Sequence, residues 1–272
     1  MDNPEAMDEE VRKEPLPGPA EAPGAGAPDP TPLAGAEPEV FWGYADLCLF
    51  VFFGLLGLLA CSALLKIEAA VFHFAKPPVA ALLSAQMVTY ATLFGGLRLM
   101  FRMQYNRPFW SSLGWRALPV AAPYVVAVGA LTAAAASVAG GLIHLPQTGN
   151  QMTELLSQGN LAILLMAVFG VGIAPLCEEL AFRGFLQPLL ARSFGAPAGI
   201  LAAGVAFGLL HFQEYGNSWR HALLLSGAGA CFGWMRHATK STKASVIMHA
   251  SYNGLLFVLL ALAIFAERNQ HH

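Results

Sequence analysis

Long apolar runs separated by short polar breaks cover the chain from about residue 47 to residue 265. The runs approach the length of about 20 residues that a helix needs to cross a bilayer. The breaks contain helix-ending residues, as in "NRPFW", "LPQTGN" and "SFGAPAG". The pattern predicts an all-α fold, a polytopic transmembrane helical bundle, with spans at about 47–65, 79–101, 119–143, 159–174, 176–193, 197–212, 219–236 and 243–265. The fourth run continues into the fifth through "GIAPLCEE", so we expect seven or eight spans.

The first 45 residues have a different composition, rich in Pro, Ala, Gly and Glu. With few large apolar residues, this segment buries too little surface to offset its ordering entropy, and we expect a disordered tail. No basic region leads directly into a short apolar core, so we do not expect a signal peptide. The chain is therefore divided into a tail, residues 1–45, and a transmembrane helical domain, residues 46–268.

Charge limits the class of protein and indicates an orientation. Only 12% of the residues are charged, about half of the 25% found in soluble domains, and the net charge of −2 indicates no nucleic-acid partner. Basic residues cluster between the second and third spans, whereas residues 144–158 contain none, which predicts a cytoplasmic amino terminus. Arg236, Lys240 and Lys243 agree with this orientation only for seven spans. Compact loops and an Ala/Gly-rich composition indicate a prokaryotic plasma membrane.

A few ionisable side chains remain inside the apolar runs, and polar groups at membrane depth normally face a cavity or one another. They are chiefly Glu178, Glu179, Arg183, His211 and His249. Glu179 and Arg183 are four residues apart on a predicted helix, in the favourable order for an ion pair. This pairing leaves Glu178 as an unpaired carboxylate. In the alternative, Arg183 bridges both glutamates as a purely structural device.

His211 is the predicted partner of Glu178. The two are 33 residues apart, and their midpoint falls in the turn "SFGAP". In an antiparallel helical hairpin, residues equidistant from the turn lie level with each other. A single histidine in an apolar helix more often packs as a core residue, but one level with an unpaired glutamate favours function.

His249 and Asn253 are four residues apart and share a face of the last predicted helix. They serve either as donors toward a developing oxyanion or as an interhelical hydrogen bond. At 1.5 Å per residue, ideal helices leave a gap of about 10 Å between His249 and the level of Glu178 and His211.

These groups supply the parts for peptide-bond hydrolysis without a covalent intermediate. Glu178 and His211 can take a proton from water, and His249 and Asn253 can stabilise the oxyanion. There is no GxSxG motif and no phosphate-binding glycine loop. Glu178, His211 and His249 could bind zinc, but the local HExxH pair is absent, so we expect no required metal and keep zinc as an alternative.

Three motifs resemble those of the CAAX protease and bacteriocin-processing family of intramembrane proteases, the Abi proteins, which includes the type II CAAX prenyl endopeptidase. EExxxR begins at Glu178, FxxxH joins Phe207 to His211, and HxxxN joins His249 to Asn253. The resemblance covers about residues 119–265. It implies the same roles for the four catalytic candidates, with Glu179, Arg183 and Phe207 in support. It also implies a substrate that is a membrane-associated protein or peptide, prenylated or not, and many members are called metalloproteases.

Two other classes of function compete with the protease. A non-catalytic scaffold or immunity protein would use the same polar cluster to bind a partner, and its function would survive Glu178→Gln. A small transporter would be expected to carry internal repeats, and none is visible in the sequence.

Overall fold

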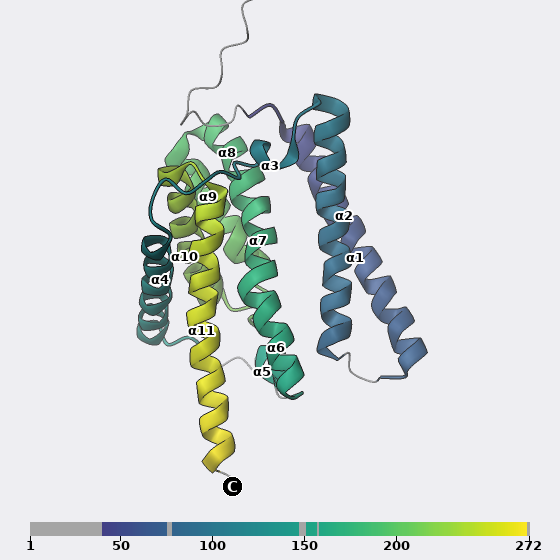
Figure 1. Cartoon of the computed structure of the whole chain (residues 1–272), viewed down its shortest axis with the longest axis vertical. Coiled ribbons are helices and arrows are strands. Elements are labelled where there is room, and N and C mark those ends of the chain that lie inside the picture. The colour runs from purple at the N-terminus through teal and green to yellow at the C-terminus, as the bar shows by residue number, and fades with distance from the viewer. Residues whose placement is uncertain (1–39, 75–77, 147–150, 157, 271–272) are drawn as a thin grey trace, which may run out of the picture. The chain divides into compact units, whose positions relative to one another are not determined.

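A computed structural model describes residues 40–74, 78–146, 151–156 and 158–270. The chain divides into two units, Met1–Ala36 and Glu37–His272, and every described residue lies in the second. The described residues form helices and connecting turns, without strands, so the all-α prediction is confirmed (Figure 1). The helices are α1 (Tyr44–Phe72), α2 (Val79–Tyr105), α3 (Phe109–Ser112), α4 (Ala122–Leu142), α5 (Gln151–Leu156), α6 (Asn160–Val168), the π-helical η1 (Phe169–Ile173), α7 (Ala174–Glu179), the π-helical η2 (Leu180–Leu186), α8 (Gln187–Phe194), α9 (Ala196–Leu210), α10 (Trp219–Thr239) and α11 (Thr242–Gln270).

Five helical segments within the described residues are long and apolar enough to cross a membrane. They are Tyr44–Phe72, Val79–Tyr105, Ala122–Leu142, Asn160–Phe194 and Thr242–Ala263. The fourth is a continuous helix of 35 residues, in which the predicted fourth and fifth runs join without a break. These helices indicate an integral multi-pass membrane protein.

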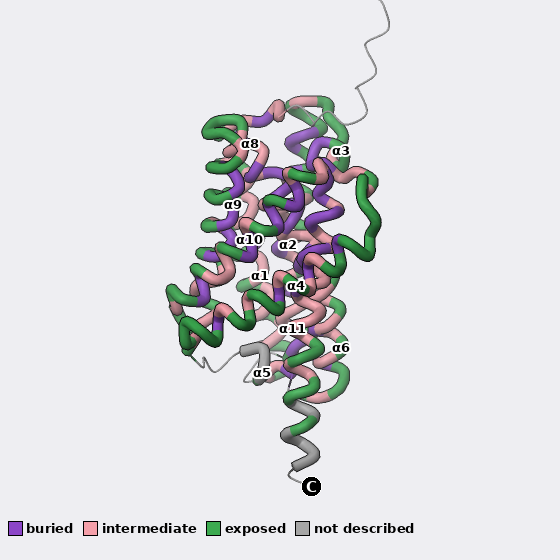
Figure 2. Tube along the Cα trace, turned by 90° about the vertical axis from the view of Figure 1, so that its left-hand side faces the viewer, coloured by how far each residue is buried: buried purple, intermediate pink, exposed green. Residues whose placement is uncertain are grey.

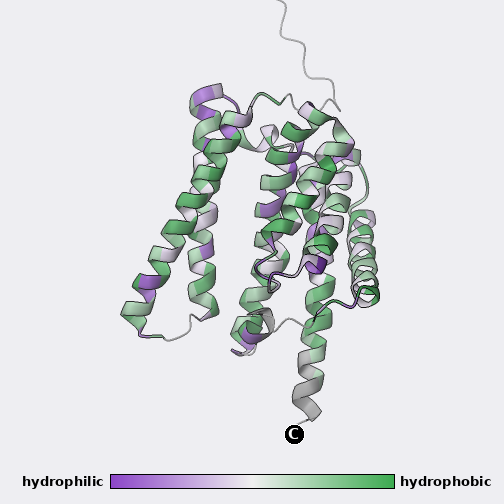
Figure 3. Ribbon diagram, turned by 180° about the vertical axis from the view of Figure 1, so that it is seen from behind, coloured by the Kyte–Doolittle hydropathy of each residue, from purple (hydrophilic) through white to green (hydrophobic). Residues whose placement is uncertain are grey.

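The outward faces of the helices are apolar, as a lipid environment requires. Figure 3 shows hydrophobic residues along most of the length of the helices, and Figure 2 shows exposed residues along their outer sides. Leu59 on α1 and Leu131 on α4 are each 69% exposed, and Leu223 on α10 is 72% exposed. A soluble protein rarely exposes apolar side chains in such large contiguous areas.

An aromatic cluster around Trp42 joins the α1–α2 hairpin to the continuous helix Asn160–Phe194. The indole of Trp42 is 1% exposed, stacks on Phe185 with 5.5 Å between ring centroids, and donates to the Phe185 carbonyl at 3.2 Å. Phe101 of α2 completes the contact. The predicted disordered tail lies outside the described residues as far as residue 39, and Val40 packs against the Trp42 cluster.

Two features fix the depth of the helices that carry the polar cluster. Gly195, with φ of 83°, forms the turn between α8 and α9, as expected for the hairpin. At the start of α11, the Thr242 N–H donates to the Gly114 carbonyl at 2.9 Å and its hydroxyl to the Leu113 carbonyl at 2.6 Å. The helix that carries His249 is thereby tied to the segment that follows α3.

Candidate active site

The two glutamates lie at the end of α7, between two π-helical segments. At η1 the Ala174 N–H donates to the Phe169 carbonyl, five residues back, and at η2 the Gln187 N–H donates to the Phe182 carbonyl. π-Helical turns are rare and often occur at functional sites. The apolar pattern predicts regular α-helix here, because nothing in it indicates an added residue per turn.

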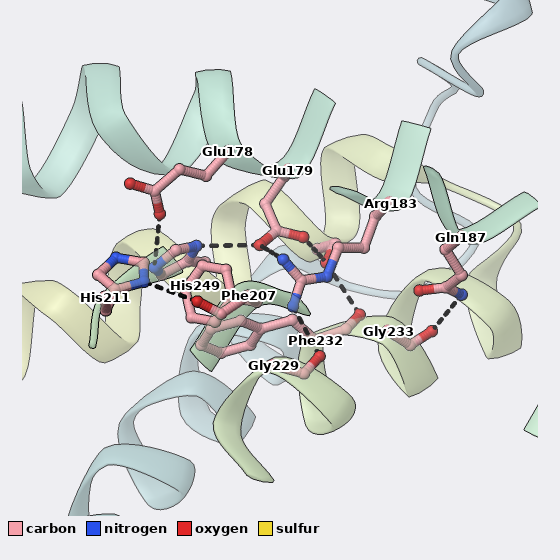
Figure 4. Close-up of polar contacts among 11 residues, drawn as sticks. Glu178, Glu179, Arg183, Gln187, Phe207, His211, Gly229, Phe232, Gly233 and His249 are labelled. Carbon is pink, nitrogen blue, oxygen red and sulfur yellow. Dashed lines mark hydrogen bonds and ion pairs between the residues drawn. The ribbon is translucent and has the colours of Figure 1, made fainter. Parts of the chain in front are cut away.

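Glu179 is fully buried, and neighbouring side chains hold both of its oxygens (Figure 4). Nη1 of Arg183 lies 2.9 Å from Oε1, and Nδ1 of His249 lies 3.0 Å from the same oxygen. The hydroxyl of Ser245 donates to Oε2. The Glu179–Arg183 ion pair expected from the spacing is present. Glu179 is therefore an anchor for its neighbours rather than a free base.

Arg183 is fully buried and connects Glu179 to α10. Its Nη2 donates to the Gly229 carbonyl at 2.7 Å. The guanidinium also lies over the rings of Phe207, Phe182 and Phe232, between 4.8 and 5.5 Å from their centroids. A Cβ at Gly229 would lie 3.0 Å from Nη2, so the glycine leaves room for this contact.

Glu178 has different surroundings from its neighbour. Its side chain is 17% exposed, and Oε2 lies 3.8 Å from Nε2 of His249. In Figure 4 its carboxylate lies at the end of the cluster opposite Gln187. Adjacent carboxylates thus differ in their surroundings: Glu179 is buried and paired, and Glu178 is partly exposed.

His211 ends α9 and packs against Phe207, the residue four positions earlier. Its Nδ1 donates to the Phe207 carbonyl at 2.8 Å, and the two ring centroids are 4.6 Å apart. In the described part of the chain, no hydrogen bond or ion pair joins His211 directly to Glu178 (Figure 4). The Phe207 ring also contacts the His249 ring, with 5.5 Å between centroids. Phe207 therefore lies between the two histidines and supports both.

His249 is close to both glutamates, so the expected gap of about 10 Å is absent. That value assumed regular helices of uniform rise, whereas α7 lies between two π-helical segments. The His249 ring is 2% exposed and stacks on Phe232, with 4.4 Å between centroids. Asn253, one turn further along α11, donates through Nδ2 to the Gly170 carbonyl at 2.8 Å.

Two buried polar residues of this cluster were not predicted from the sequence. Ser245 lies four residues before His249, and Gln187 lies four residues after Arg183 and donates to the Gly233 carbonyl at 3.0 Å. The available signal was the continuation of each polar stripe by one further turn. Serine and glutamine inside an apolar run are ordinary enough that the stripe alone did not select them.

The residues do not assemble into a ligand set for a metal ion. Among the described residues, no group of three or more His, Cys, Asp or Glu side chains is placed to hold one. The oxygens of Glu179 are already engaged by Arg183, His249 and Ser245.

Comparison with known proteins gives one match. Residues 158–255 match a family model described as type II CAAX prenyl endopeptidase Rce1-like. The matched region contains all seven candidate site residues, from Glu178 to Asn253. No curated protein and no solved structure matched the chain.

Proposed function

Residues 158–255 belong to the Rce1-like type II CAAX prenyl endopeptidase family, which indicates an intramembrane protease, and on that premise we propose that the chain cleaves a membrane-associated protein or peptide. The observation that carries the proposal is the contrast between two adjacent carboxylates. Glu179 is fully buried and bonded to Arg183, whereas Glu178 is 17% exposed and faces the imidazole of His249. A purely structural ion pair needs only one of them.

In this proposal Glu178 and His211 activate the attacking water. Glu178 is the acceptor that water can reach. Since Nδ1 of His211 donates to the Phe207 carbonyl, Nε2 of the neutral ring carries a lone pair and can also accept a proton. A correctly placed general base typically contributes 10²–10⁴-fold to a rate, in order of magnitude.

His249 and Asn253 stabilise the oxyanion. Nδ1 of His249 donates to Glu179, so Nε2 donates only when the ring is protonated. Water adds to the carbonyl carbon and gives up one proton to Glu178 or His211. Collapse of the tetrahedral intermediate breaks the C–N bond, and that proton passes to the leaving amine.

The proposed chemistry needs no metal, and zinc-dependent hydrolysis is the alternative. The proposal rests on the acid–base groups just described, in which the protein's own side chains hold and move the protons. A CAAX-type substrate with a prenylated cysteine is proposed by family membership alone.

We also propose seven crossings, with the amino terminus in the cytoplasm of a prokaryotic cell. Two further helices, α9 and α10, add to the five candidate spans, and the exposed Leu223 of α10 supports its contact with lipid. The contact between Thr242 and Gly114 brings the α10–α11 turn to the same end as the basic α2–α4 connection. Lys240 then lies on the cytoplasmic side with Arg107, as the charge bias requires.

The experiment that tests the proposal compares protein termini in membranes of the native host. One strain expresses the wild type and others express equal amounts of Glu178→Gln or Glu68→Gln. Glu68 is a matched control because it is a glutamate on α1, bonded to Ser84 and outside the cluster. We expect termini that appear with the wild type and Glu68→Gln but not with Glu178→Gln. Identical termini in all three strains, with the host phenotype intact, would instead indicate a scaffold or immunity protein.

A further inference from the structure

The amide of Asn253 bonds to a backbone carbonyl inside another helix. Its Nδ2 lies 2.8 Å from the oxygen of Gly170, which belongs to η1. A helical carbonyl normally accepts from a backbone N–H further along its own helix. The contact therefore raises the question of why this carbonyl is open to a side chain from α11.

Pro175 answers that question. In η1 the Ala174 N–H donates to the carbonyl of Phe169, five residues back. With the same spacing, the Gly170 carbonyl would accept from residue 175. Proline has no N–H, so the π-helical pattern ends there and the Gly170 oxygen turns to Asn253.

The second π-helical segment ends in the same way. The Gln187 N–H donates to the carbonyl of Phe182, and the next residue is Pro188. In both places the last N–H that donates to a carbonyl five residues back is followed directly by a proline. This repetition supports the explanation that a π-helical segment ends where a proline lacks the N–H for the next hydrogen bond.

We propose that Pro175 is a positioning residue that leaves the Gly170 carbonyl free to orient the amide of Asn253. This inference rests on the proposed function, because it concerns how the oxyanion group is aimed. An asparagine amide has two N–H donors. Gly170 engages one of them and fixes the amide plane, so the other points in a defined direction. Pro175 also lies three residues before Glu178 on α7.

The first measurement is independent of proteolysis. Protein labelled with ¹⁵N-asparagine in detergent micelles gives side-chain amide signals, and Asn253→Ala identifies the one from Asn253. In Pro175→Ala the new N–H competes for the Gly170 carbonyl, so we expect this signal to shift. Pro197→Ala is the matched control, because Pro197 lies in the first turn of α9, where helical N–H groups have no partner. An unmoved Asn253 signal in Pro175→Ala overturns the inference.

The second measurement uses a quenched-fluorescent farnesylated peptide as the substrate. We expect kcat to fall about tenfold in Pro175→Ala, the loss that corresponds to roughly one hydrogen bond, with KM unchanged. In the Asn253→Ala background, Pro175→Ala should cause no further loss. If Pro175→Ala lowers kcat by the same factor in the Asn253→Ala background as in the wild type, the inference is overturned. Pro175→Ser restores the same N–H with a different side chain, so agreement between the two variants separates the N–H from the loss of the ring.

The two measurements separate this inference from the protease assignment. If the Asn253 amide signal shifts in Pro175→Ala but the wild-type protein cleaves nothing, the positioning contact is supported and the protease is contradicted. Cleavage that is unaffected by Pro175→Ala contradicts the positioning role and leaves the protease intact.

Discussion

Nδ1 of His249 lies 3.0 Å from Oε1 of Glu179, and both side chains are buried. A carboxylate only accepts hydrogen bonds when it is ionised, and Arg183 at 2.9 Å from the same oxygen favours that state. The imidazole must therefore donate through Nδ1, which directs Nε2 toward Glu178. The buried glutamate thus determines which nitrogen the histidine presents to the site.

Replacing Glu179 by Gln should lower stability as well as activity. The change leaves Arg183 buried without a counter-charge, and breaking a buried ion pair in this way costs about 3–5 kcal/mol. We expect a lower melting temperature in detergent than for the wild type. The double variant Glu179→Gln/Arg183→Met should recover part of the loss. Equal melting temperatures for Glu179→Gln and the wild type would show that this pair is not an anchor.

Replacing Ser245 by Ala should slow catalysis without unfolding the protein. Ser245 is fully buried and donates to Oε2 of Glu179, and a hydrogen bond to a charged group contributes about 1.5–3 kcal/mol. We expect kcat to fall by one to two orders of magnitude, because Oε2 of the carboxylate that holds His249 loses its hydrogen-bond donor.

Ser251→Ala is the matched control for Ser245. Ser251 lies on the same helix and bonds to the Ile247 carbonyl at 2.7 Å, one turn back and outside the cluster. Its replacement should leave kcat unchanged. A similar loss in both variants would mean that any serine on α11 matters to folding, and Ser245 would have no specific role.

Much of the site followed from helical spacing. The Glu179–Arg183 pair and the shared face of His249 and Asn253 need only the geometry of one helix, and both are present in the structure. The α8–α9 hairpin was also predicted, from the turn "SFGAP" that contains Gly195, and it is present in the structure.

Contacts between helices could not be predicted in the same way. Asn253 bonds to Gly170, and Ser245 to Glu179, because of how deeply α11 sits against η1 and α7. That depth is set by contacts such as those of Thr242 with Leu113 and Gly114, which the apolar pattern does not indicate. Helical spacing therefore predicts Glu179, Arg183, His249 and Asn253 but not the neutral Ser245 and Gln187.

The close packing of α9 on α10 predicts opposite effects for two glycines. A Cβ at Gly208 would lie 2.2 Å from the Ala222 carbonyl, which is backbone and cannot give way. Overpacking of this kind typically costs about 1–3 kcal/mol, so we expect Gly208→Ala to lower the melting temperature and displace His211 at the end of α9. A Cβ at Gly227 meets nothing within 4 Å, and Gly227→Ala should gain up to about 1 kcal/mol from helix propensity. Thermal unfolding of both variants checks this, and a stabilised Gly208→Ala would contradict the packing.

Metal chelation should leave the activity unchanged. Glu178 and His211 can accept the proton of water themselves, so the proposed chemistry does not depend on a bound cation. The purified protein is incubated with EDTA or 1,10-phenanthroline, and cleavage of a farnesylated peptide is measured before and after dialysis. We expect equal rates. Loss of activity that zinc restores would establish the zinc-dependent alternative.

The arrangement of loops predicts which side of the membrane each one faces. In a variant with all four cysteines replaced by Ala, single cysteines are introduced at exposed positions and treated with a membrane-impermeant maleimide. With seven crossings, Ser111→Cys and Ala238→Cys react from the cytoplasmic side and Gln213→Cys from the other. Eight crossings reverse the last two, because a break between the fourth and fifth runs would invert every later loop. The Thr242–Gly114 contact requires Ala238 and Ser111 to share a side, since the α10–α11 turn lies against the segment that follows α3. Labelling of these two positions from opposite sides would therefore contradict both the seven-span topology and the packing of α11 that sets the depth of His249.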